Sequence, residues 1–269
     1  MVETIKLSAP ATRGFWEIPV LFEDEWLLAL AKPANLLCSS SPTEVDRPSL
    51  TQLLHAGITA QKPWAQQRGL SFLGLARRLD FEVGGVVLFA KSQAVLAELA
   101  NLFGTEKPAD DYLALVVGTP EADQFEVTVK IAPDPLRPEL SRVDARQGRK
   151  SKTRFEVVEK FAGYTLLRCR PLIWREHQIR VHLKSARLPV VGDPSYGGKP
   201  LWLSRLKKDY RLKPGRTERP LISQPALYST QLHLPHPVTQ QPLLVTAPQP
   251  KDLRVALRYL REFRGGQTP

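Results

Sequence analysis

One aspartate stands where a carboxylate could do chemistry. Asp80 lies in LARRLDFEVGGVVLFAK at 75–91, directly after two arginines and shortly before an apolar, β-branched run. This order places the carboxylate in a loop that enters a buried strand. A carboxylate in such a position could act as a nucleophile, as a base or as a stabiliser of positive charge. The segment alone also allows a surface Arg–Asp ion pair, worth well under about 1 kcal/mol.

A second segment, WREHQIRVHLKSARLPVVGDPSYGG at 174–198, carries further polar groups. Its pattern predicts a helix over 175–187. Arg180 lies within that helix and could keep a nearby carboxylate ionised, because an adjacent guanidinium lowers a carboxyl pKa. Arg175 and His177 stand at the start of the predicted helix, where backbone N–H groups can bind phosphate. We therefore expect Arg175 and His177 near a phosphate-bearing substrate.

Several common chemistries lack their motifs in this chain. Neither GxxxxGK[ST] nor a strand–GxGxxG–helix occurs, so no nucleotide cofactor is predicted. HExxH and CxxC are missing, so no metal site is predicted. GxSxG is missing too, which argues against a hydrolase nucleophile elbow. A metal-dependent phosphodiesterase with Asp80 and Asp193 as ligands remains a distant alternative.

The charge balance points to a polyanionic partner. The 269 residues hold 38 Lys and Arg against 27 Asp and Glu, a formal net charge of +11. The cations concentrate at 137–152 and 205–219, both expected as surface loops because they are poor in apolar residues and contain Pro or Gly. Neither segment has the amphipathic period of a membrane-surface helix. Since they bracket the 174–198 segment, nucleic acid is the favoured partner.

Composition indicates a globular protein of a reducing compartment. Hydrophobic residues make up 42% and charged residues 24%, ordinary values for a folded chain. Two cysteines, Cys38 and Cys169, exclude a disulfide scaffold. The apolar runs are too short to cross a bilayer, and the N-terminus shows no export signal. We expect a cytoplasmic monomer that makes no membrane contact.

The elements that must position these residues follow from periodicity and turn signals. Strands are predicted at 20–23, 26–31, 84–90, 111–118, 124–131, 153–161, 164–170, 226–236 and 243–248, and helices at 48–55, 93–103, 175–187 and 251–263. Many strands pair in sequence without βαβ alternation, so the fold class is α+β, with a mixed, mainly antiparallel sheet. We predict an N-terminal arm over 1–18 and a single catalytic domain over 19–263.

Five blocks in one order resemble the RluA-type pseudouridine synthases, a family of RNA uridine isomerases. They are FEDEWLLALAKPANLL at 22–37, RRLDFEVGGVVLFAKS at 77–92, DYLALVVG at 111–118, the 174–198 segment, and ALYSTQLHLPHPVT at 226–239. No S4-type RNA-binding segment is seen ahead of the first block. The resemblance implies the fold of that family: a mixed, mainly antiparallel sheet with flanking helices and a central catalytic cleft. This agrees with the fold class predicted from the pattern.

The resemblance also implies residue roles. Asp80 matches the essential catalytic aspartate of the family. Arg78 matches the arginine that reaches into the RNA stack where the target base was. Tyr112 matches the tyrosine that lies against the uracil ring, and Arg180 matches the arginine that pairs with the aspartate. Arg175 and His177, which stand near Arg180, are expected as further RNA contacts.

Four positions depart from the usual family pattern. The family usually has His at Arg77, Gly at Asn35, Thr-Gly at Ile173–Trp174 and His-Ala at Tyr228–Ser229. None of these departures removes the matched aspartate, tyrosine or arginine. They bear on substrate choice more than on chemistry.

The implied reaction breaks the N1–C1′ bond of a uridine, turns the uracil and rejoins it through C5. No atoms leave and no redox change occurs, so no cofactor is required. The base must leave the RNA stack at a cost of about a few kcal/mol, which Arg78 can offset by filling the gap. The predicted substrate is a uridine in structured ribosomal or transfer RNA. The main alternative, motivated by Arg77 and Ile173–Trp174, is a non-catalytic RNA-binding protein on the same fold.

Overall fold

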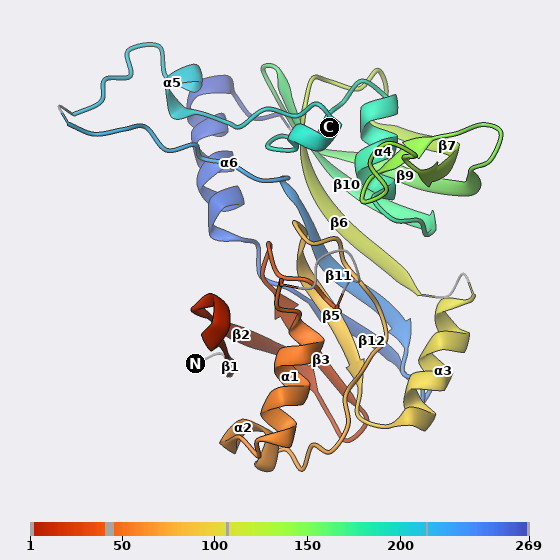
Figure 1. Ribbon diagram of the computed structural model, residues 1–269. Helices are drawn as coiled ribbons and strands as arrows, with labels where there is room; N and C mark the ends of the chain where they lie inside the picture. Colours follow the sequence, from red (N-terminus) through yellow and green to blue (C-terminus); the bar gives the residue numbers. More distant parts are fainter. Residues whose placement is uncertain (1–2, 41–45, 106–107, 214, 268–269) are drawn as a thin grey trace. The chain divides into compact units, whose positions relative to one another are not determined.

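The computed structural model describes residues 3–40, 46–105, 108–213 and 215–267. The chain divides into two compact units, each built from two stretches of sequence (Figure 1). Unit 1 comprises Met1–Asp110 and Ser229–Pro248, and unit 2 comprises Asp111–Tyr228 and Gln249–Pro269. The single domain over 19–263 stays a prediction.

The strands of unit 1 follow the order β1–β2–β3–β5–β11. These are β1 (Thr4–Ala9), β2 (Gly14–Glu23), β3 (Leu27–Lys32), β5 (Gly84–Ala90) and β11 (Leu227–Pro235, in unit 1 from Ser229), with β4 (Gly74–Leu75) on β5 and β12 (Pro242–Thr246) on β11. The registers of β1–β2, β2–β3, β3–β5, β4–β5 and β11–β12 are antiparallel. The predicted arm over 1–18 thus contributes a strand and half of another to this sheet.

The helices of unit 1 are α1 (Leu50–Thr59), α2 (Pro63–Gln66) and α3 (Gln93–Phe103). α3 is as predicted: the Ser92 side chain accepts a hydrogen bond from the Val95 N–H, and the helix ends at Gly104. The predicted start of α1 near Asp46, at residue 48, was wrong. Ser49 is the N-cap and forms a reciprocal capping box with Gln52, which fixes the first turn after it.

Unit 2 is built on antiparallel strands in the order β6–β10–β9–β7–β8. They are β6 (Ala109–Val117, in unit 2 from Asp111), β7 (Gln124–Pro133), β8 (Ser141–Val143), β9 (Arg149–Phe161) and β10 (Tyr164–Ile173). The predicted hairpin around Ala162–Gly163 is confirmed. In β7 the apolar residues alternate with exposed polar ones, as a strand with one solvated face requires.

The helical segments of unit 2 are α4 (Gln178–Ser185), η2 (Pro194–Tyr196), α5 (Leu203–Leu206) and α6 (Lys251–Arg264). α6 buries the stripe Leu253, Ala256, Leu257 and Leu260, close to the predicted pattern. α4 is shorter than the predicted 175–187. His177 has a left-handed backbone (φ 55°) and ends the helix on its N-terminal side, so Arg175 precedes α4 rather than opening it.

The fold class is confirmed as a mixed, mainly antiparallel sheet with helices. The 205–219 segment is a loop apart from its first residues, which end α5. The prediction for 137–152 was wrong in part, because β8 and the start of β9 occupy much of it. Among the described residues, no helix is long and apolar enough to cross a membrane.

Candidate active site

Asp80 lies in the tight turn that leads into β5. Its backbone carbonyl accepts a hydrogen bond from the Val83 N–H at 3.2 Å, which closes the turn. The preceding residues alternate, with Arg78 exposed, Leu79 buried and Asp80 half-buried. Arg78 therefore stands at the surface beside a partly accessible carboxylate, as an RNA-contacting arginine must.

A buried lysine, Lys32 at the end of β3, braces this turn. Its ammonium group donates hydrogen bonds to three backbone carbonyls, those of Pro33 (3.0 Å), Leu36 (2.7 Å) and Phe81 (3.2 Å). Burial lowers the pKa of Lys32 to about 8, and the negative charges of neighbouring groups, Asp80 among them, oppose that shift. Lys32 thus ties two loops together beneath Asp80 and places positive charge near its carboxylate.

Two departures in unit 1 have local structural explanations. Asn35 has a left-handed backbone (φ 60°), and its N–H donates to the Phe81 carbonyl at 2.9 Å. Asparagine is among the few residues other than glycine that adopt this conformation readily, so it replaces the usual glycine without altering the turn. Arg77 forms an ion pair with Asp110, and both side chains are almost fully buried.

The glycine pair after Asp80 has a packing reason. Gly85 has φ 128°, and a side chain there would collide with the Ser229 carbonyl oxygen of β11. The backbones of β5 and β11 approach each other closely at this point. Only glycine allows β5 to start immediately after the Asp80 turn.

In unit 2, Tyr112 lies on β6 and is buried, with its ring centroid 5.5 Å from that of Trp174. Trp174 follows the end of β10 and is 37% exposed. Leu172 and Ile173 beside it are also exposed, although both are large and apolar. The departure at Ile173–Trp174 therefore places an exposed apolar cluster next to Tyr112.

Arg180 on α4 has a carboxylate partner that the sequence did not assign to it. Its Nε and Nη2 donate to the two carboxylate oxygens of Asp193, at 2.7 and 2.9 Å. Arg180 is 1% exposed and Asp193 is fully buried. This grip is side-on, through Nε and Nη2 on one edge of the guanidinium. It also occupies both Asp193 oxygens, which argues against Asp193 as a metal ligand.

A second layer holds the Arg180–Asp193 pair. The Tyr196 ring lies 4.8 Å from the Arg180 guanidinium carbon, a cation–π contact. The Tyr196 hydroxyl accepts a hydrogen bond from the Ser141 N–H and lies 2.8 Å from His177 Nδ1. His177 is buried, whereas Arg175 is half-buried and donates to the Trp174 carbonyl. The expected contacts of Arg175 and His177 with RNA stay predictions.

The structure brings the predicted residues together in two groups. Asp80 and Arg78 lie in one loop of unit 1, and the other four, Tyr112, Arg175, His177 and Arg180, lie in unit 2. The pairing of Asp80 with Arg180 would join the two units and stays a prediction. Within the described ranges, no group of three His, Cys, Asp or Glu side chains is placed to hold a metal ion.

Comparisons with known proteins assign these residues to a family. The model of the RNA pseudouridylate synthase family matches residues 27–185, which include Asp80, Tyr112 and Arg180. The chain is 33% identical over 247 residues to ribosomal large subunit pseudouridine synthase D of Nitrosomonas europaea, covering 91% of this chain and 66% of that relative. The chain belongs to the RNA pseudouridylate synthase family. It is therefore an RNA pseudouridine synthase, an isomerase.

A second bacterial relative supports this assignment, and a solved structure shows the same fold. Ribosomal large subunit pseudouridine synthase C of Escherichia coli K12 is 32% identical over 251 residues, covering 91% of this chain and 70% of that relative. The solved structure of human RNA pseudouridylate synthase domain containing 4 has a TM-score of 0.64 at 22% identity, covering 96% of this chain and 95% of that one, and shows the same fold. The chain spans about two thirds of the length of the two bacterial relatives. Asp193 and Tyr196 lie beyond the residues that the pseudouridylate synthase model matches.

Proposed function

We propose that this chain converts uridine to pseudouridine in the RNA of the large ribosomal subunit, with Asp80 as the catalytic carboxylate. The observation that carries the proposal is the similarity, across 91% of the chain, to two enzymes named for the large ribosomal subunit. The turn geometry supports it, because a half-buried Asp80 stands beside an exposed Arg78. Transfer RNA, the other predicted substrate, is disfavoured by the names of these relatives.

The chemistry divides among the named groups. The N1–C1′ bond breaks, C1′ bonds to C5, and the proton on C5 leaves for N1, so the atoms balance without any co-reactant. Asp80 stabilises or traps the cationic sugar, or takes the 2′ proton, and each route needs the ionised carboxylate. The guanidinium of Arg180 pairs with this carboxylate.

The remaining groups handle the base. Arg78 enters the stack vacated by the flipped uridine and contacts phosphate. Tyr112 offers its ring face to the detached uracil while it turns, and its hydroxyl assists the proton transfer at C5. Arg175 and His177 stand near Arg180 and help to hold the RNA backbone. We further propose a cytoplasmic monomer, which the two free, buried cysteines support.

The decisive test is Asp80→Asn. The substitution removes a charge that the reaction needs while keeping nearly the same volume, so we expect pseudouridine formation to fall by at least about a thousandfold. RNA affinity should stay near that of the wild type. Asp46→Asn is the matched control, since Asp46 is an exposed aspartate of the same unit.

The assay is pseudouridine mapping of large-subunit RNA from cells that lack the protein, complemented with each variant. An Asp80→Asn variant as active as the wild type would refute the assignment of the catalytic residue. The alternative, a non-catalytic RNA-binding protein, predicts no difference in pseudouridine content between cells with and without the protein. One of its motives is weaker now, because Arg77 has a structural role with Asp110.

A further inference from the structure

The two basic segments differ in how far their charges are already paired. The 137–152 segment holds six Lys and Arg residues. Half of them form ion pairs with neighbouring carboxylates: Arg137 with Asp134 (3.9 Å), Arg142 with Asp144 (3.1 Å) and Lys152 with Glu126 (2.7 Å). A large part of the positive charge of this segment is thus neutralised within the protein.

The 205–219 segment is different. Its seven cations are all exposed: Arg205, Lys207, Lys208, Arg211, Lys213, Arg216 and Arg219. In the described part of the chain none of them forms an ion pair with a carboxylate. Of the two acids in the segment, Glu218 is engaged elsewhere, because its carboxylate accepts a hydrogen bond from the Ser204 N–H at 2.9 Å. The positive charge of this segment is therefore available to a partner.

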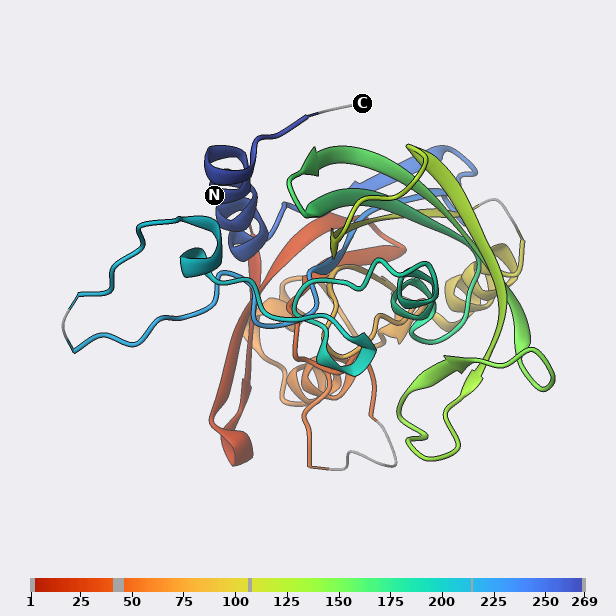
Figure 2. The same cartoon turned by 90° about the horizontal axis from the view of Figure 1, so that it is seen from above.

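Helix α6 of the same unit extends this charged surface. Lys251, Arg254 and Arg258 are exposed and lie three and four residues apart, on one side of the helix. α5 packs on α6, and Figure 2 shows the loop extending away from both helices. Arg264 of α6 also donates a hydrogen bond to the Arg205 carbonyl at 2.6 Å. Loop and helix are thereby joined at the base of the loop.

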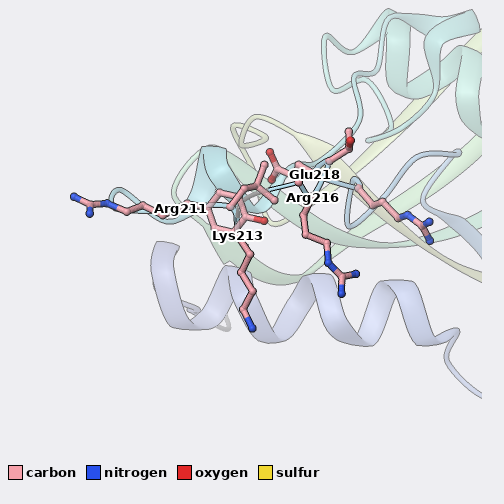
Figure 3. Close-up of a pocket in the computed structure, with 9 residues that line it drawn as sticks. Arg211, Lys213, Arg216 and Glu218 are labelled. Carbon is pink, nitrogen blue, oxygen red and sulfur yellow. The ribbon is translucent and has the colours of Figure 1, made fainter.

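The base of the loop is fixed by hydrogen bonds. The Leu201 N–H donates to the Ile222 carbonyl at 2.9 Å, and the Leu221 N–H donates to the Leu201 carbonyl at 2.7 Å. Between these anchors the chain curves around an open concavity of about 710 Å³, lined by residues of the loop itself. In Figure 3, Lys213 and Arg216 extend toward the side on which the ribbon of α6 is drawn, and Arg211 extends to the left. Long loops of this kind usually serve a function.

We propose that 205–219 and the exposed cations of α6 form an RNA-backbone binding surface, which holds phosphates of the substrate outside the modified nucleotide. RNA is taken as the polyanion because this inference rests on the proposed function. Arginine supplies forked donors that match phosphate oxygens. A lipid surface fits less well, because Leu212 is the exposed large apolar residue of the segment and a membrane-bound segment needs an apolar face.

The test compares two triple variants of the full chain that remove the same charge. Arg211→Gln/Lys213→Gln/Arg216→Gln neutralises the loop, and the control Arg137→Gln/Arg142→Gln/Lys152→Gln neutralises the paired cations of the other segment. The probe is a fluorescent RNA duplex of about 20 base pairs, long enough for several phosphate contacts, and its affinity is measured by anisotropy at increasing KCl. Matching circular dichroism spectra confirm that each variant is folded.

We expect the loop variant to bind RNA at least about tenfold more weakly at 0.15 M salt. The slope of log affinity against log salt concentration should be smaller in magnitude by about 2 to 3. The control should keep the affinity and slope of the wild type. Equal losses in both variants, or no loss in the loop variant, would overturn the proposal. So would wild-type binding to phosphatidylserine vesicles that exceeds binding to the duplex.

These results are separable from the proposed function. Suppose that the wild type forms no pseudouridine, while the loop variant still binds the duplex more weakly than the control variant. The proposed isomerase activity would then be refuted and the RNA-binding surface retained. A wild type that forms pseudouridine while both triple variants bind the duplex equally well would do the reverse.

Discussion

Asp193→Asn tests the part of the site that the structure revealed and the sequence did not. The Arg180–Asp193 pair has two charge-assisted hydrogen bonds, of 2.7 and 2.9 Å, and both side chains are buried. Removing one partner of such a pair costs about 3–5 kcal/mol, because the remaining charge is left uncompensated in the interior. Asparagine keeps the volume and one acceptor oxygen, so we expect a loss near the lower end, about 3 kcal/mol.

Asp111→Asn, on strand β6 of the same unit, is the matched control. Arg170 donates to Asp111 through the same two nitrogens, at 2.7 and 2.9 Å, and this bonding raises the pKa of Arg170. The Arg170 side chain is 40% exposed, however, whereas that of Arg180 is buried. Water can solvate Arg170 after the substitution, so we expect a loss of about 1 kcal/mol or less.

Urea unfolding at pH 7 gives the free energy of unfolding of both variants. Equal losses would refute the reasoning, since the bonding geometry is the same and only burial differs. The pH profile of single-turnover pseudouridine formation adds a readout that stability does not affect. If Asp193 orients Arg180 toward Asp80, the acid limb of that profile moves to higher pH in Asp193→Asn. A slower reaction with an unmoved acid limb would show that Arg180 does not act on Asp80.

Two further predictions concern the groups on either side of the site. Burial holds the pKa of Lys32 at about 8, below its ordinary 10.5, so between these values the unfolded chain binds the proton more tightly and stability rises with pH. The free energy of unfolding of the wild type minus that of Lys32→Met should therefore grow by up to about 3 kcal/mol from pH 8 to 10.5, and a constant difference in urea titrations would contradict this. Trp174→Ala should raise the KM for large-subunit RNA by about tenfold or more through the loss of base stacking, and Trp174→Phe should restore most of it. An unchanged KM for Trp174→Ala would remove Trp174 from the substrate site.

The sequence predicts those elements whose signals are local. α3 and α6 carry their apolar stripe and end signals within the helix itself, so their ranges were predicted closely. α4 began later than predicted because the left-handed backbone of His177 leaves no mark in the hydrophobic pattern. β1 and β8 were missed: β1 alternates buried and solvent-facing residues but was assigned to an arm, and β8 is only three residues long.

The candidate site divides in the same way. Asp80, Tyr112 and Arg180 were predicted from their order in the family blocks, and their roles stay predictions. The partner of Arg180 was not, because Asp193 is joined to it through a loop whose geometry no periodic pattern encodes. The run GDPSYGG was the available signal: a lone carboxylate and a tyrosine in a glycine-rich turn, both of which the structure turns toward Arg180.

The departures from the family pattern can now be separated by what their side chains contact. Arg77 and Tyr228–Ser229 have side chains in the interior, whereas Asn35 is exposed in its turn. Asn35 adopts the backbone that glycine would, Arg77 pairs with buried Asp110, and the Tyr228 hydroxyl donates to Asp252 at 2.7 Å. Burial raises the pKa of Tyr228, which keeps it a neutral donor beside that carboxylate. Arg77 and Tyr228 thus have partners inside the protein, and Asn35 keeps the left-handed backbone of its turn.

Ile173–Trp174 is the departure that exposes large apolar side chains. The exposed indole of Trp174 can be stabilised by stacking on a base. Trp174 also lies against Tyr112, which is expected to contact the uracil. A change in which nucleotide is accepted next to the target uridine would therefore arise at Trp174.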